Sequence, residues 1–311
     1  MPLKTFSRLI YNSFQSNFRN ETMLLNNETM VLTAPRLRAY LVALKIITMK
    51  KFIVRACLLA SGIILFNACT KDGLNSRNAS AVDAATAKDQ SSDEVKNNID
   101  KLVKNIHWIE QACFRIDAGK YTVYIDPNSV PDNIKADVIL ITHPHGDHWS
   151  QAELDKIVKP TTILIAPAEI VYNGQIGKRI ILKPGEEYNF SGNIKIKAVP
   201  AYNIDKTWAH PKENNWVGYL VKINGITIYH AGDTELIPEM KTFTADIAML
   251  PLGQTYTFNS VDDAAQAAKD VHAKLAIPMH FSLYEGTAED AVTFKSILQG
   301  SIPVVIMEKG K

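Results

Sequence analysis

The chain has 311 residues, of which 46% are hydrophobic and 21% are charged, and its formal net charge is +2. This is the composition of an ordinary globular protein that is long enough to bury a substantial core. The charge is uneven, because residues 1–69 carry nine Lys or Arg against two Glu, so the remaining residues sum to −5. Binding to a phosphate backbone needs clustered Lys and Arg, and the acidic remainder therefore argues against nucleic acid as a partner.

Residues 49–69 predict export. A basic start at residues 50–55 precedes an apolar run at residues 56–66, and Cys69 follows closely. This pattern resembles a bacterial lipoprotein signal, although Phe66 and Asn67 depart from the usual cleavage motif. The resemblance implies a lipid on Cys69 and a membrane anchor at the cell envelope of a Gram-negative bacterium, on the periplasmic side or the surface. The alternative is a membrane-spanning helix, but about a dozen uncharged residues fall short of the ~20 that cross a bilayer.

Four parts are expected along the chain. Residues 1–48 carry no motif and form an upstream extension if Met49 is the true start, and residues 49–69 are the signal. Residues 70–98 are rich in Ser, Ala, Asn, Asp and Lys and predict a flexible tether. The folded domain is expected at residues 99–311, where Cys113 is the one cysteine, so no disulfide can form within it. The sequence does not indicate an oligomeric state.

Short apolar runs and helical periodicity alternate through this domain. Strands are predicted at residues 113–116, 121–125, 138–142, 162–165, 194–199, 217–223, 226–230, 247–250, 275–279 and 304–307. Helices are predicted at residues 150–158, 167–173, 261–272 and 288–298, the third with Ser260 as its N-cap. Early strands in hairpins followed by strands that alternate with helices indicate an α/β fold in which sheets and helices form layers.

A histidine-rich motif follows the predicted strand 138–142. It runs His143-Pro144-His145-Gly146-Asp147-His148 in a loop that leads into a helix. Alternate histidines can direct two imidazoles at one ion, while Asp147 and His148 reach a second. Chance would give this spacing in about 3 of 10,000 such chains, which favours a metal site over the alternative of three solvated surface histidines.

Two further ligand candidates occur where later strands end. The strand 226–230 continues into Gly232 and Asp233, and the glycine permits a tight turn that would bring the carboxylate to the cluster. The strand 275–279 ends directly before His280. Both positions match that of the motif, at the carboxyl end of a strand.

Three segments, THPHGDHW, YHAGDT and PMHF, occur in this order and spacing. They resemble the metallo-β-lactamase superfamily, and the likeness covers nearly all of residues 99–311. It is closest to a compact branch with ascorbate-6-phosphate lactonase-like proteins and uncharacterised metal-dependent hydrolases, and more distant from N-acylphosphatidylethanolamine phospholipase D. The resemblance implies a four-layered αβ/βα sandwich. It also implies two divalent metal ions, with zinc expected and manganese or iron compatible with the same ligands.

The resemblance also implies the role of each ligand: metal 1 on His143 and His145, metal 2 on Asp147, His148 and His280, and Asp233 as the bridge. The sequence departs from the family pattern at the third ligand of metal 1. Asn203 occupies the position where related proteins often have histidine. His210 is the favoured substitute, and Asn203 would then be a weaker oxygen ligand or hold a water. His230 is expected to support the ligands rather than to bind metal.

The expected activity is hydrolysis of an ester, phosphodiester, lactone or amide, carried by a small-molecule or lipid substrate. A hydroxide shared by two metals would attack, and Asp147 would orient it. The alternative is a lipid-anchored metal-binding or sensor module without turnover. Aromatic residues that flank the motif loops are candidates for the substrate wall, although each is more often a core residue: Trp149, Tyr202, Trp208, Trp216 and Tyr256.

Overall fold

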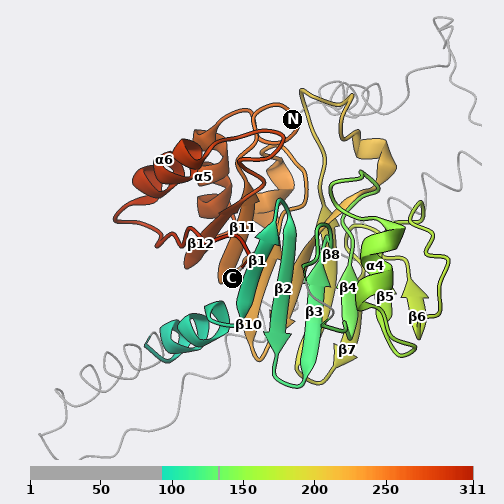
Figure 1. Cartoon of the computed structure of the whole chain (residues 1–311). Helices are drawn as coiled ribbons and strands as arrows, with labels where there is room; N and C mark the ends of the chain where they lie inside the picture. The colour runs from blue at the N-terminus through green and yellow to red at the C-terminus, as the bar shows by residue number, and fades with distance from the viewer. Residues whose placement is uncertain (1–92, 132–133, 311) are drawn as a thin grey trace, which may run out of the picture. The chain divides into compact units, whose positions relative to one another are not determined.

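The computed structural model describes residues 93–131 and 134–310 (Figure 1). Their strands form two six-stranded sheets. The first sheet begins with two antiparallel pairings and continues with three parallel ones. Its order is β1 (Ile106–Glu110), β2 (Cys113–Ala118), β3 (Tyr121–Ile125), β4 (Val138–Leu140), β5 (Ile163–Ile165) and β6 (Lys178–Ile180).

The second sheet has antiparallel pairings from β7 to β10 and parallel pairings from β10 to β12. Strands β8, β10, β11 and β12 therefore share one direction, and their carboxyl ends meet at one edge, where α/β folds commonly place ligands. In chain order the strands are β7 (Glu187–Ser191), β8 (Ile194–Pro200), β9 (Val217–Ile223), β10 (Ile226–His230), β11 (Ile247–Pro251) and β12 (Leu275–Met279).

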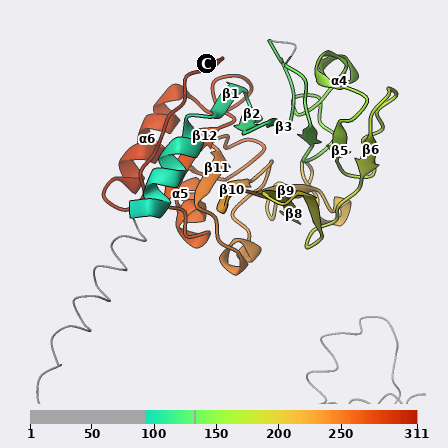
Figure 2. The same ribbon diagram turned by 90° about the horizontal axis from the view of Figure 1, so that it is seen from below.

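Helices cover the outer faces of the two sheets, as the view from below shows (Figure 2). Helix α4 (Gln151–Ile157) lies against the first sheet, and α5 (Val261–Asp270) and α6 (Ala288–Leu298) lie beyond the second. A further helix spans residues 93–103, and two short 3-10 helices lie at Lys212–Asn214 and Pro238–Thr242. The predicted four-layered α/β sandwich is confirmed.

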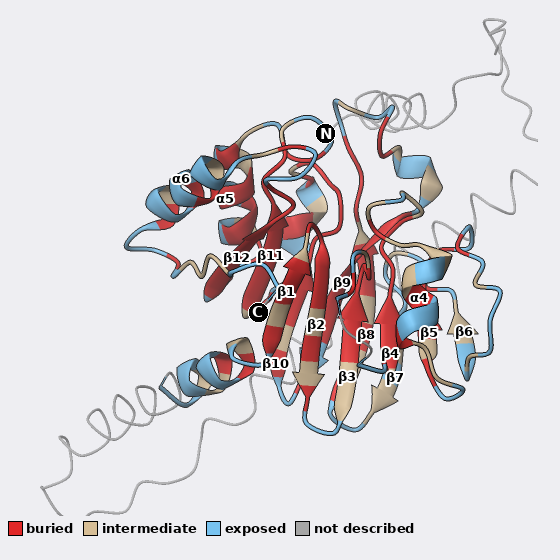
Figure 3. Ribbon diagram, in the orientation of Figure 1, coloured by how far each residue is buried: buried red, intermediate tan, exposed pale blue. Residues whose placement is uncertain are grey.

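The central strands of both sheets are largely buried (Figure 3). Strand alternation divides their apolar residues between two cores. Phe114 and Ile116 of β2 point toward the second sheet and join the large core between the sheets, whereas Cys113 points outward. The outward face packs beneath α4, where Leu154 and Ile157 are fully buried. A two-residue side-chain period thus lets one strand serve both layers.

Three strands were not predicted from the sequence, and all three lie at sheet edges. β1 and β6 end the first sheet and β7 ends the second. The edge strands β6 and β7 carry mostly polar side chains, which keep edges from pairing with other chains, so their apolar alternation is weak. β1 is largely apolar and buried, and polarity does not explain why it was missed. The apolar run at residues 304–307 was predicted as a strand but makes only one bridge, between Val304 and Ala276.

Two helical boundaries also differ from expectation. The predicted helix 167–173 is wrong: these residues form turns, and the stretch is too short and too rich in branched residues to offset helix nucleation. The first described helix starts at residue 93, inside the predicted tether, because Val95, Ile99 and Leu102 form an apolar stripe against the core. Within the described residues, no helix is long and apolar enough to cross a membrane. The extension, the signal and most of the tether lie outside the described residues.

Candidate metal centre

The histidine motif lies in a loop that Asp126 holds in place. The two Asp126 carboxylate oxygens accept from the Thr142 backbone N–H and from its hydroxyl, each at 2.7 Å. The same carboxylate lies 2.8 Å from Nδ1 of His148. A buried acid at the end of β3 therefore fixes both the start of the motif and its last ligand candidate.

The first group of ligand atoms consists of His143, His145 and His210. Nε2 of His143 lies 3.1 Å from Nδ1 of His145 and 3.4 Å from Nε2 of His210. All three residues offer ligand atoms within 4.8 Å of one another. The ring of Trp216 packs against all three imidazoles, with centroid distances of 5.1 to 5.7 Å.

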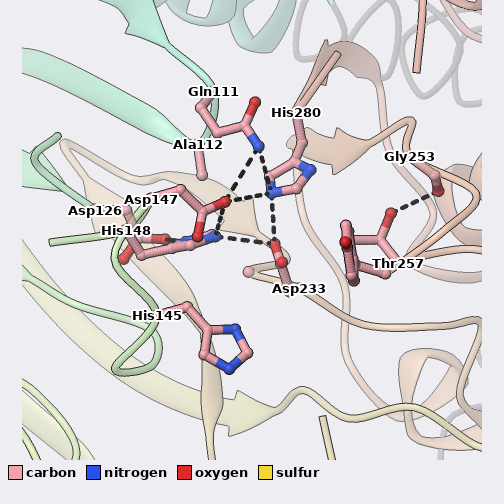
Figure 4. Close-up of polar contacts among 12 residues, drawn as sticks. Gln111, Ala112, Asp126, His145, Asp147, His148, Asp233, Gly253, Thr257 and His280 are labelled. Carbon is pink, nitrogen blue, oxygen red and sulfur yellow. Dashed lines mark hydrogen bonds and ion pairs between the residues drawn. The ribbon is translucent and has the colours of Figure 1, made fainter. Parts of the chain in front are cut away.

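The second group consists of Asp147, His148 and His280. Oδ2 of Asp147 lies 3.5 Å from Nε2 of each histidine (Figure 4). His280 comes directly after β12 and adopts a left-handed backbone conformation with φ of 60°. Such a conformation is uncommon outside glycine and is found where the surroundings fix a functional side chain.

Asp233 lies between the two groups and offers one oxygen to each. Its Oδ2 is 3.4 Å from Nε2 of His210 and 3.9 Å from Nε2 of His143. Its Oδ1 is 3.3 Å from Nε2 of His148 and 3.2 Å from Nε2 of His280. Gly232 makes this reach possible, since it has a φ of 63° and a Cβ there would meet Val217 and Thr142.

The electrostatics of the centre fit a divalent cation. Burial alone would raise the pKa of Asp233, yet the positive charges of His280 and His148 hold it well below its usual range. Burial likewise opposes charge on these two histidines, but the Asp233 carboxylate raises their pKa values well above the ordinary one. Three atoms of this set are buried without a hydrogen-bond partner: Nδ1 of His280, and Nε2 of His148 and Oδ1 of Asp233, which face the space between the ligand groups. A metal ion would satisfy the last two and replace the protons as the source of positive charge.

The first group is suited to metal binding in a different way. Burial lowers the pKa values of His143 and His145, and it lowers that of His210 to about 4. These imidazoles are therefore neutral at pH 7, which is the state in which histidine binds metal.

Each buried imidazole has a partner on its far nitrogen. Nδ1 of His148 is hydrogen-bonded to Asp126, whereas Nδ1 of His280 lies at an ion-pair distance of 2.9 Å from Oε1 of Glu285 without hydrogen-bond alignment. Nδ1 of His143 lies 3.0 Å from the Thr142 hydroxyl, and Nδ1 of His210 lies 3.2 Å from the Tyr256 carbonyl. These partners favour the tautomer with Nδ1 protonated and leave Nε2 for a metal. Carboxylates thus support the second group, whereas neutral groups support the first.

Other predicted residues lie around these ligands rather than among them. The Asn203 amide nitrogen donates to the Tyr256 carbonyl at 2.7 Å and lies 3.3 Å from Nδ1 of His210, while its Oδ1 is buried without a hydrogen-bond partner. His230 contacts the Ala112 carbonyl through Nε2 and accepts from the Gly232 N–H through Nδ1, so it supports the turn that carries Asp233. Both of its ring nitrogens are therefore occupied by main-chain groups.

The predicted aromatic wall is only partly in place. Tyr202 was a candidate for the substrate wall, but it is buried and does not line the cavity. Its hydroxyl donates to Glu239 and accepts from Lys212. Trp149 donates to the Pro144 carbonyl and packs beneath the motif. A cavity of about 520 Å³ lies over the two ligand groups, and its lining consists of His145, Gly146, Asp147, Trp208, Ala209, His210, Asp233, Tyr256, His280 and Tyr284.

Sequence reasoning missed four residues that contact the candidate ligands: Gln111, Asp126, Thr142 and Glu285. The Gln111 amide lies 2.9 Å from Nε2 of His280 and donates to Asp147 at 3.3 Å (Figure 4). Asp126 follows a predicted strand, as Asp233 does, and that position was a usable signal. Gln111 and Glu285 stand in no motif.

The centre has known relatives. A family model described as "Beta-lactamase superfamily domain" matches residues 105–280. A UPF0173 metal-dependent hydrolase of Methanoregula boonei is 31% identical over 224 residues, covering 66% of this chain and 95% of the relative. One from Thermoplasma acidophilum is 34% identical over 207 residues, covering 62% and 89%. A crystal structure assigned as a metal-dependent hydrolase from Parabacteroides distasonis has a TM-score of 0.59 at 35% identity, covering 66% and 92%. The chain therefore belongs to the metallo-β-lactamase superfamily of metal-dependent hydrolases.

Proposed function

We propose that the chain hydrolyses an ester, lactone, amide or phosphodiester with two divalent ions, one held by each ligand group. The observation that carries this proposal is the position of Asp233, whose two oxygens each lie within 3.4 Å of imidazole nitrogens from a different group. Asp233 could therefore take part in holding both ions. Such ions, when bound, would activate a water and polarise the scissile carbonyl or phosphoryl group.

Three residues near the ligand groups, Asp147, Gln111 and Trp216, are assigned roles in positioning the attacking water and excluding other water. Asp147 is the carboxylate of the second group that lines the cavity, and its Oδ2 faces His148, His280 and the Gln111 amide. Its Oδ1 is therefore the oxygen free to accept a hydrogen bond from the attacking water. Gln111 keeps the carboxylate turned in this direction. Trp216 packs beside the first group and excludes water from one side of it.

The nature of the ions follows from the ligands. Imidazole and carboxylate without thiolate favour zinc, and manganese or iron are compatible with the same set. His210 is proposed as the third ligand of metal 1 in place of Asn203, supported by its neutral state and its 3.4 Å distance from His143. This assignment weakens the case for a sensor without turnover, because that alternative rested on an incomplete metal 1 site.

Metal stoichiometry and turnover test the proposal together. Elemental analysis of the metal-replete protein should give two ions per chain, and Asp233→Ala should lose both, whereas Asp262→Ala, on exposed α5 surface, should keep both. The loaded protein should hydrolyse at least one class in a panel of aryl esters, lactones, amides and phosphodiesters, with activity lost on chelation. One ion or none would refute the two-ion centre. Two ions without turnover of any class would refute the hydrolase.

We also propose that the enzyme works at the cell envelope, anchored by a lipid on Cys69. The support is the sequence of residues 49–69, with its basic start, apolar run and cysteine. A lipid anchor on a tether would hold the catalytic domain beside the membrane, where lipid or envelope-derived substrates are concentrated.

A further inference from the structure

The mouth of the cavity carries three aromatic side chains that reach it from three loops. Trp208 is 69% exposed, Tyr284 63% and Tyr256 39%, and all three line the cavity above the ligands. Trp208 and Tyr256 meet edge to face with ring centroids 5.7 Å apart. Exposed large aromatic groups gathered at a pocket mark a surface that gains stability when a ligand covers it.

The same lining contains no lysine or arginine. Among the described residues that line the cavity, the charged or ionisable groups other than tyrosine are histidines of the two ligand groups and the carboxylates of Asp147 and Asp233. Lys206 lies in the loop that carries Trp208, but its ammonium group is bound by Asn259 Oδ1 at 2.7 Å and by the Gln254 carbonyl at 3.2 Å. An anionic group at the mouth would therefore find no lysine or arginine to pair with.

We propose that the part of the substrate extending from the scissile bond to the mouth is an uncharged flat or apolar group that packs on Trp208, Tyr256 and Tyr284. This inference rests on the metal-dependent hydrolysis proposed above and names its substrate class. The scissile group occupies the metal centre, and the aromatic rings receive the remainder. Esters, amides or lactones with an aryl or apolar substituent fit this arrangement.

Substrates that have a phosphate or carboxylate group at a distance from the scissile bond should bind poorly. Such a group would lose its hydration at the mouth and gain only aromatic faces and the nearby acid of Asp147 in return. A sugar phosphate lactone, the substrate type named for one related branch, belongs to this excluded class. An uncharged ring, in contrast, should gain about 2- to 10-fold in affinity for each aromatic contact.

Two hydroxamates that share a chelating group but differ in the rest test the proposal without requiring turnover. Benzohydroxamate should bind the zinc-loaded protein at least about tenfold more tightly than acetohydroxamate in calorimetric titration. Trp208→Ala and Tyr284→Ala should each lower the ratio of the two dissociation constants. Ile204→Ala, an exposed apolar residue in the same loop as Trp208 but outside the cavity lining, should leave the ratio unchanged. A para-phosphono benzohydroxamate should bind more weakly than benzohydroxamate.

The outcomes separate this inference from the hydrolase proposal. A ratio near one, an unchanged ratio in both aromatic variants, or tighter binding of the phosphono probe would overturn the substrate class, even if the protein hydrolyses other compounds. A large ratio that falls in the variants would support the aromatic subsite, even if no panel substrate turns over. If neither hydroxamate binds, elemental analysis shows whether the metal centre is missing, and the inference falls with it.

Discussion

Replacing Glu285 with glutamine should weaken the second ion site while keeping the shape of the side chain. Oε2 of Glu285 accepts from the backbone N–H groups of Thr255 and Tyr256 at 2.9 and 2.7 Å, and Oε1 faces Nδ1 of His280 at 2.9 Å. In Glu285→Gln the amide oxygen must accept from the two backbone N–H groups. The amide N–H₂ group then points toward His280. Two donors cannot pair, so the imidazole is driven to the tautomer whose proton sits on Nε2, the atom that should bind metal.

The size of the effect follows from the hydrogen bonds that the substitution weakens. Substitution of a group that orients a metal-binding histidine typically reduces metal affinity 10- to 100-fold, or about 1.4 to 2.7 kcal/mol. The folded state should also lose about 1 to 3 kcal/mol, because two charge-assisted hydrogen bonds become neutral ones. Gly253→Ala provides a second route to the same carboxylate, since a Cβ at residue 253 would collide with the Glu285 side chain.

A chelator competition titration on the metal-free protein measures the two ion affinities. Glu235→Gln is the matched control: Glu235 is also buried, and its carboxylate accepts from the backbone of Ile204, Asp205 and Lys206 at 2.7 to 3.0 Å. Its carboxylate holds backbone rather than a ligand candidate, so this variant should lose stability but keep the affinity of the second site. Wild-type affinity in Glu285→Gln, or an equal loss in Glu235→Gln, would refute the tautomer argument.

Two further predictions concern metal 1 and the anchor. His210→Ala should lower the affinity of the first ion about 10-fold or more, whereas Asn203→Ala should lower it less because imidazole is the stronger ligand and Asn203 holds the Tyr256 carbonyl beside it; a larger loss at Asn203 in the same titration would reverse the assignment. Cys69→Ser should leave an uncleaved precursor when expressed in a Gram-negative host, and the native form should be released from membranes by detergent but not by high salt; an unmodified N-terminus in the soluble fraction would contradict export.

Most of the sheet core could be predicted because its signal is local. β3, β9, β10 and β12 have the bounds that the apolar runs indicated, and α6 runs over Ala288–Leu298 as expected. The missed strands depend on a neighbour for their pairing, so β6, with Lys178 and Arg179 in three residues, has no apolar pattern of its own. Tertiary context determines such elements.

For the site too, residues with a local sequence signal could be predicted and residues placed only by the fold could not. Candidate ligands within one motif, such as His143 and His148, could be predicted because their spacing is local, and Asp233 and His280 because each follows a strand. Glu285 could not be found, since it lies in an irregular loop after His280 and only the fold brings its carboxylate back to Nδ1. Contacts of this kind leave no periodicity in the sequence.

Tyr256 supports both halves of the centre with its main chain alone. Its N–H donates to Glu285, behind His280, and its carbonyl lies beside His210, while its side chain faces the cavity. Any residue can supply the same carbonyl, and any residue except proline the same N–H. The ring can therefore be exchanged during evolution or in the laboratory without removing the support of the ligands. Residue 256 is accordingly a position at which substrate preference can diverge among relatives while metal binding is inherited unchanged.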